Sequence, residues 1–350
     1  MPEFATDSIQ IKVKHLLNHT SGIKSYTRIN GMMSGKSKSK DRSIQDIINL
    51  ILNDKYDFKV GEKYRYNNSA YYLLGAIIER TSGMSFENYL KRNFFIPFEM
   101  NSTFMFDPDI DESELQERKA IGYKKADSLF FESNPMHPSF LFSAGGMSST
   151  VNDLWKWNKA LVSGKILNKN MLHKAWEQTK LNTGEIVDYG FGWDIGRIKK
   201  FKVLGHSGFV EGFTSYQLIV PEANIYVCVL ENSFLVSSKN LAYDLAEKII
   251  FNPNNSSPKT ILPNTVVLDD YIGQYKIKEN DIRTIFKKEG KLFSKRNDGI
   301  EFEIIPVSKD TFKFALSNST LIFIRNESGT IEAVKLIDRR WSSLNSIKIN

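Results

Sequence analysis

The sequence predicts an α+β domain, with an antiparallel sheet and flanking helices, followed by an all-β antiparallel barrel. In the first 251 residues, helical and strand-like hydrophobic periods alternate. In residues 265–350, short β-rich runs are separated by turns. Between them, segment 252–264 mixes three prolines with Asn and Ser, a composition that resists both helix and sheet. We therefore expect one domain over 1–251, a linker over 252–264 and a second domain over 265–350.

Composition excludes several classes of protein. The 350 residues are 41% hydrophobic and 25% charged, which is typical of a globular chain. The net charge of +7 is spread without a basic run, so we expect no nucleic-acid partner. The apolar runs are shorter than the roughly 20 residues of a membrane span. The lone Cys228 excludes an internal disulfide, and no export signal is visible at the start.

Two helices are predicted in the first part of the chain. Ser43 is a capping residue before 43–53, where four isoleucines fall on one face. Residues 69–82 repeat the helical spacing of apolar side chains, and Gly83 provides a stop. Both helices would bury one face against a common core.

A third helix and a hairpin follow. Thr150 opens a T-x-x-D helix start. Two apolar runs, Phe213–Val220 and Ile225–Glu231, flank the turn sequence of residues 221–224 and predict a β-hairpin. Residues 241–250 then return to helical spacing, which completes the α+β pattern.

The last part of the chain favours strands. Turn pairs such as Glu289-Gly290 and Ser328-Gly329 separate its β-rich runs, so we expect a small antiparallel barrel or sandwich. The predicted strands are Ile282–Lys287, Phe302–Val307, Thr311–Leu316, Leu321–Arg325 and Ile331–Ile337.

Three patterns resemble functional motifs but fail on context. Gly31–Ser37 is one residue short of a phosphate loop and follows no buried strand, so a polar loop is expected. Gly190–Gly196 is one residue too long for a dinucleotide fingerprint. His15 and His19 are four residues apart, but without an H-E-x-x-H motif a structural role is favoured over a metal site.

Three polar segments stand out, each weak alone but informative in their order along the chain. They are Val13–Gly22, which contains L-L-N-H-T-S-G, then Tyr66-Asn67-Asn68, and then Gly205–Gly208, which reads G-H-S-G. With Ser143–Thr150 between them, they resemble the class C β-lactamase and DD-peptidase superfamily over about residues 9–250. Residues 268–340 resemble the lipocalin-like barrel appended to such enzymes. The resemblance implies a β-lactamase/transpeptidase-like sheet and no cofactor or metal.

The resemblance assigns a role to five residues. Tyr66 matches the proton-relaying phenol, and Asn68 matches the amide that holds the substrate. His206 matches the cationic or hydrogen-bonding position, Ser207 the hydroxyl, and the backbone N–H of Phe209 an oxyanion donor. Taken singly, three of them have an ordinary alternative: a half-buried aromatic for Tyr66, a helix cap for Asn68 and a satisfied strand-end histidine for His206.

The nucleophile of the family is the Ser of an S-x-x-K at the start of a buried helix. Three S-x-x-K matches begin at Ser21, Ser37 and Ser256, in a turn, a charged loop and a proline-containing linker. None of these contexts predicts a buried helix start. We therefore expect an N-terminally incomplete member of the family that forms no acyl-enzyme as written.

Several functional expectations follow from the resemblance. The complete enzyme would hydrolyse an amide or ester through an acyl-serine, acting on a D-Ala-D-Ala-type peptide, a small ester or a β-lactam. A non-catalytic protein that binds cell-wall peptide or a small ligand is the alternative, and a ligand carrier built on the barrel is another. The resemblance implies an extracytoplasmic setting. An incomplete sheet would expose an edge through which chains could associate.

Overall fold

The computed structural model describes residue 4 and residues 10–53, 56–105, 119–126, 129–134, 136–251, 267–297, 299, 301–315, 319–338 and 341–349. The chain divides into two compact units, Met1–Ala242 and Tyr243–Asn350. The predicted linker over 252–264 lies outside the described residues, so the domain boundaries stay a prediction.

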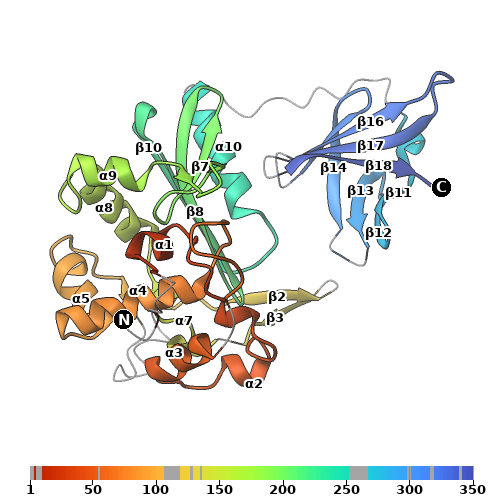
Figure 1. Ribbon diagram of the computed structural model, residues 1–350. Coiled ribbons are helices and arrows are strands. Elements are labelled where there is room, and N and C mark those ends of the chain that lie inside the picture. The colour runs from red at the N-terminus through yellow and green to blue at the C-terminus, as the bar shows by residue number, and fades with distance from the viewer. Residues whose placement is uncertain are drawn as a thin grey trace. The chain divides into compact units, whose positions relative to one another are not determined.

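Helices make up much of the first unit (Figure 1). Short ones precede α4, and α8 packs against strand β10. The described helices of this unit are α1 (Val13–Leu17), η2 (Tyr26–Arg28), α2 (Gly35–Lys38), α3 (Ile44–Leu52), α4 (Asn68–Ser82), α5 (Phe86–Leu90), η3 (Lys91–Phe95), α7 (Pro138–Leu141), η4 (Phe142–Ala144), α8 (Val151–Val162), α9 (Lys169–Ala175), η5 (Pro221–Ala223) and α10 (Ser238–Phe251), which crosses the unit boundary.

The predicted helix ends are largely confirmed. Ser43 caps α3 by accepting a hydrogen bond from the backbone of Asp46, as the sequence indicates. Gly83 ends α4 with a φ of 70°, a left-handed conformation that glycine adopts without strain. Thr150 caps α8. The predicted polar loop at 31–37 is wrong in its second half, where α2 begins at Gly35.

The core of the first unit lies between α3 and α4. Ile47, Ile48 and Ile51 of α3 pack with Leu73 and Tyr72 of α4, and all five are at most 3% exposed. Burying a large apolar side chain of this kind contributes about 1.5–3 kcal/mol. This core holds the first residues of α4 in place, and the predicted Tyr-x-Asn motif lies at that end of the helix.

The sheet is antiparallel, and β8 lies between β7 and β9. Its described strands run in the order β10–β9–β8–β7, from Ile225–Glu231 through Phe213–Val220 and Phe201–Val210 to Asp194–Ile198. The predicted hairpin is confirmed, because β9 and β10 begin and end at the predicted residues. Short two-stranded pairs join β1 (Phe104–Met105) to β4 (Met147–Ser148), β2 (Tyr123–Ala126) to β3 (Leu129–Glu132), and β5 (Thr179–Lys180) to β6 (Ile186–Val187).

The second unit is a closed antiparallel barrel, which settles the choice between a barrel and a sandwich. Its interior is filled by packed aromatic and aliphatic side chains, among them Tyr271, Tyr275, Phe312 and Phe323. The 3-10 turn η6 (Leu268–Tyr271) leads into it. The strands in barrel order are β11 (Gly273–Lys278), β12 (Asp281–Lys288), β13 (Lys291–Arg296), β14 (Phe302–Ser308), β15 (Thr311–Phe314), β16 (Thr320–Arg325), β17 (Ile331–Asp338) and β18 (Trp341–Lys348).

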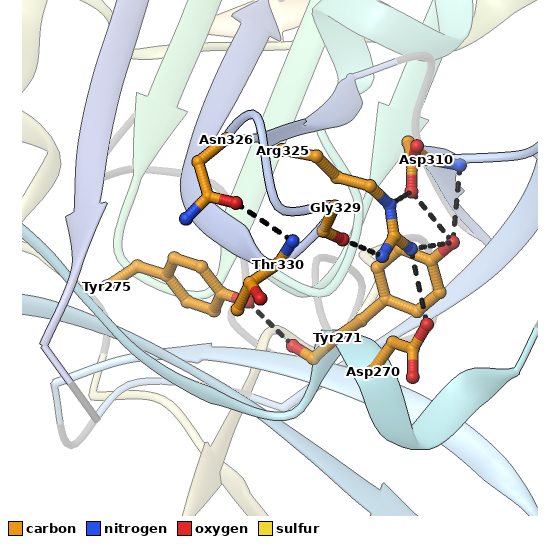
Figure 2. Close-up of polar contacts among 8 residues, drawn as sticks. All are labelled: Asp270, Tyr271, Tyr275, Asp310, Arg325, Asn326, Gly329 and Thr330. Carbon is orange, nitrogen blue, oxygen red and sulfur yellow. Dashed lines mark hydrogen bonds and ion pairs between the residues drawn. The ribbon is translucent and has the colours of Figure 1, made fainter.

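A polar network ties η6 to β16 in the second unit (Figure 2). The Arg325 guanidinium donates to Asp310 at 2.9 Å and to the carbonyl of Gly329 at 2.7 Å, and it pairs with Asp270 at 3.3 Å. The Tyr271 hydroxyl donates to Asp310 at 3.0 Å. These charge-assisted bonds link segments that are up to 55 residues apart in the chain.

The α+β fold with a C-terminal antiparallel barrel is therefore confirmed. Within the described part of the chain, no helix is both long and apolar enough to cross a membrane. Among the same residues, no three or more His, Cys, Asp or Glu side chains are grouped so that they could hold a metal ion.

Candidate active site

The segment after α1 is folded into a tight turn that buries His19. His19 has a φ of 58° and is 1% exposed, an uncommon conformation for a residue other than glycine. Backbone bonds hold the turn on both sides, since Arg65 N–H donates to the His19 carbonyl and Gly61 N–H donates to the Thr20 carbonyl. At Gly22, with a φ of 74°, a Cβ would lie 2.0 Å from the Phe58 carbonyl oxygen, so only glycine fits there.

The Tyr-Asn-Asn segment reaches this turn just before α4. Asn67, not Asn68, is the helix cap: its side-chain oxygen accepts from the backbone of Ala70 at 3.2 Å. Its side-chain amide also donates to the Ile23 carbonyl, and its backbone N–H donates to His19 Nδ1 at 3.1 Å. The capping alternative for Asn68 is therefore wrong. Asn68 is the first residue of α4, and its amide donates to Thr27 Oγ1 at 3.3 Å.

Strand β8 presents an open edge beside this segment. The pairing of β8 with β7 ends at Gly205, which lies opposite Asp194. Val210 and Phe213 close a two-residue turn to β9, and bonded pairs alternate with unbonded pairs along an antiparallel ladder. Ser207 and Phe209 therefore fall at positions whose backbone N–H and C=O groups point away from β9. The predicted oxyanion donor, the N–H of Phe209, lies on this open edge.

Aromatic side chains from the Tyr-Asn-Asn segment and from β8 lie close together. The centroids of the Tyr66 and His206 rings are 5.8 Å apart, although the residues are 140 positions apart in the chain. The Tyr66 ring also lies 4.3 Å from the His19 ring. The structure thus brings Tyr66 and His206 together, with Asn68 two residues from Tyr66 and with Ser207 and Phe209 on the same strand as His206.

Tyr189 joins the two histidines and was missed by the sequence reasoning. Its hydroxyl lies 3.1 Å from His19 Nε2 and 3.0 Å from His206 Nε2. It immediately precedes Gly190, in the glycine-rich segment that fails as a dinucleotide fingerprint. At Gly190 a Cβ would lie 2.3 Å from the carbonyl oxygen of Ala175, so the backbones approach closely there; in the sequence, the only signal is the glycine itself.

The site contains few charges. Burial, with a smaller contribution from His206, lowers the pKa of His19 to about 3, so its imidazole is neutral at ordinary pH. Burial and then the Asp194 carboxylate raise the pKa of Tyr66, so its phenol keeps its proton. Asp194 itself forms an ion pair with Lys239 at 3.3 Å.

The S-x-x-K matches do not supply a nucleophile helix among the described residues. Ser21 is 1% exposed and lies in the turn after α1, outside any helix. Ser37 lies in the last turn of α2, where its hydroxyl accepts from the Arg42 guanidinium. The match at Ser256 lies outside the described residues.

Comparisons with known proteins agree with this architecture. The family model described as beta-lactamase matches residues 1–249. Penicillin-binding protein 4* of Bacillus subtilis is 24% identical over 323 residues, which cover 86% of this chain and 70% of that protein.

Two solved structures are also similar. An octameric penicillin-binding protein homologue from Pyrococcus abyssi is 27% identical with a TM-score of 0.61, over 97% of this chain and 78% of that chain. A D-amino acid amidase from Ochrobactrum anthropi, solved with L-phenylalanine amide, is 26% identical with a TM-score of 0.55, over 64% of this chain and 65% of that chain. Because the family model matches more than half of its length, this chain belongs to the beta-lactamase family, whose members are serine hydrolases of amide or ester bonds.

Proposed function

We propose that the first unit forms the substrate-binding walls of a serine hydrolase cleft that takes the carbonyl of a peptide, small ester or β-lactam. One observation carries the proposal: the Tyr66 ring lies 5.8 Å from the His206 ring, across the open edge of β8. Within the described residues, the Tyr66 hydroxyl has no hydrogen-bond partner, so it is available to a ligand.

Strand β8 and the segment before α4 each contribute a hydrogen-bond donor to the ligand. The N–H of Phe209 points from the β8 edge and acts as an oxyanion donor, a role worth about 3–4 kcal/mol to a transition state. The Tyr66 phenol relays a proton and is the second hydrogen-bond donor. Asn68, held by its bond to Thr27, binds the amide of the substrate. The Phe209 side chain is 70% exposed and stacks on Phe234, which adds an apolar surface for a ligand side chain.

The substrate class is a D-amino acid amide, peptide, small ester or β-lactam. A D-amino acid amidase and penicillin-binding proteins are among the similar proteins; the first name points to a D-amino acid amide and the second to a β-lactam. Acylation also needs the Ser of an S-x-x-K helix. Since the described S-x-x-K matches do not begin a helix, we propose that these 350 residues bind such ligands without forming an acyl-enzyme.

Binding and acylation are tested separately. Calorimetry with N-acetyl-D-alanyl-D-alanine amide should show saturable binding, which Tyr66→Phe weakens by about threefold to tenfold because one hydrogen bond is lost. Tyr89→Phe, in α5, is the matched control and should bind as the unchanged chain does. Equal affinity for the Tyr66 variant would refute the role of the phenol.

A fluorescent penicillin and a fluorophosphonate probe report on acylation. We expect no label on the 350-residue chain, and a label at one serine once a segment carrying an S-x-x-K helix is joined before residue 1. Labelling of the chain by itself would refute the proposed lack of acylation. Binding without label in the joined protein would favour the non-catalytic peptide-binding alternative.

We also propose that copies of the chain associate through the sheet. β10 is an end strand of the described sheet, and an unpaired strand edge is a template for another chain. The Pyrococcus homologue is named as octameric, which supports self-association in this family. Light scattering should show a mass that is a multiple of 40.1 kDa, and Leu230→Pro in β10, where the backbone N–H points away from β9, should reduce it to one copy. A single-copy mass for the unchanged chain would refute the proposal.

A further inference from the structure

A continuous chain of hydrogen bonds connects α4 to the open edge of β8. It begins at the backbone N–H of Asn67, which can only donate, so His19 Nδ1 must be the acceptor at 3.1 Å. His19 is buried and neutral, and it therefore carries its single hydrogen on Nε2. That N–H donates to the Tyr189 oxygen, 3.1 Å away.

At the His206 end of this hydrogen-bond chain, the position of one hydrogen is fixed in the same way. His206 Nδ1 lies 2.7 Å from the carbonyl oxygen of Ser207, and a carbonyl can only accept. His206 therefore carries a hydrogen on Nδ1. In a neutral imidazole Nε2 is then bare, and it accepts the Tyr189 hydroxyl hydrogen at 3.0 Å. With a neutral His206 ring, each donor in the chain has an acceptor, and the direction set at the His19 end continues to the Ser207 carbonyl.

This arrangement leaves His206 with nothing to offer an anion. Both ring nitrogens are engaged within the protein, and the ring lies 5.8 Å from the Tyr66 ring and 5.9 Å from the Tyr189 ring, measured between centroids. The nearby charges, Asp194 and Lys239, neutralise each other as an ion pair.

We propose that Tyr189 is a positioning residue that holds His206 in the neutral, Nδ1-protonated tautomer, and that the cleft consequently selects uncharged carbonyl ligands over anionic ones. The tautomer assignment stands on the hydrogen-bond geometry, and the ligand preference rests on the binding cleft proposed above. The preference disfavours the carboxylate-bearing members of the substrate class, which are β-lactams and peptides with a free C-terminus.

Nitrogen NMR of the histidine side chains tests the tautomer without any ligand. At pH 8 the unchanged chain should show His206 with a protonated Nδ1 and a bare Nε2. Tyr189→Phe removes the donor to Nε2, and His206 should shift toward the Nε2-protonated form that predominates in free histidine. Tyr64→Phe is the matched control, because the Tyr64 ring lies 5.3 Å from the Tyr189 ring but its hydroxyl bonds neither histidine.

Three results would overturn the tautomer assignment. They are an Nε2-protonated His206 in the unchanged chain, a doubly protonated His206 at pH 8, and an unaltered His206 signal in a folded Tyr189→Phe variant. A doubly protonated ring would turn the Tyr189 hydroxyl toward Tyr71, its other neighbour. Because the first two results come from the unchanged chain, a variant that fails to fold does not remove the test.

The ligand preference is measured with two dipeptides that differ by one charge. N-acetyl-D-alanyl-D-alanine amide should bind the unchanged chain more tightly than the same dipeptide with a free carboxylate. His206→Lys should reverse the order by about fivefold, the gain expected from one partly exposed ion pair. Tighter binding of the free carboxylate by the unchanged chain would overturn the preference. Binding of neither dipeptide would contradict the proposed cleft and leave the tautomer result standing.

Discussion

Acid should destabilise the first unit through His19. Its pKa is about 3 in the folded chain, against about 6.5 in an unfolded one. Because the folded pKa is the lower one, the unfolded chain binds more protons, so the stability is complete above about pH 6.5 and falls as the pH drops toward 3. Between pH 8 and pH 5 this linkage removes about 2 kcal/mol of unfolding free energy.

Urea unfolding at the two pH values, followed by circular dichroism at 222 nm, measures this loss. The signal reports mainly the first unit, because the described α-helices other than α10 lie entirely within it. His19→Asn is the comparison, since asparagine tolerates the φ of 58° and keeps an acceptor for the Asn67 N–H. Carboxylates titrate in both proteins and cancel. The unchanged chain should lose about 2 kcal/mol more than the variant, and equal losses would refute the buried, neutral His19.

Three further changes test the packing and the caps. Gly75→Ala should destabilise the first unit by about 1–3 kcal/mol despite the better helix propensity of alanine, because its Cβ would lie 2.2 Å from Ser143 Oγ; a rise in urea midpoint would contradict this. Asn67→Ala removes the α4 cap and should cost about 1–2 kcal/mol in thermal unfolding at 222 nm, whereas an unchanged midpoint would show that the cap is dispensable. Arg325→Met breaks the pair with Asp310 and should speed hydrogen exchange of the β16 amides, and unaltered exchange would argue against the network in Figure 2.

Local patterns allowed much of the fold to be predicted. The helix over 43–53 and the hairpin at 213–231 follow from caps, periods and turn residues that lie within a few positions of one another. The sequence does not distinguish a barrel from a sandwich, because closure depends on the pairing of β11 with β18, whose residues lie about 70 positions apart. No short-range pattern encodes such a contact.

The site was predicted less completely, for two physical reasons. Asn67 and Asn68 have the same capping propensity, so only the exact start of α4 decides which one caps. Tyr189 lies 170 positions from His19, and its role exists only once the turn after α1 meets the segment before β7. The family resemblance indicated Tyr66 and His206, but the bonds that orient His206 come from the three-dimensional arrangement.

The most direct measurement of the proposed cleft follows the backbone amide of Phe209. Adding N-acetyl-D-alanyl-D-alanine amide to the isotope-labelled chain should move the Phe209 N–H resonance downfield, with the same saturation curve as the calorimetric binding, because the ligand carbonyl accepts from it. Tyr66→Phe should weaken that curve by the same factor as it weakens binding. A ligand that saturates the protein while the Phe209 resonance stays in place would contradict the account.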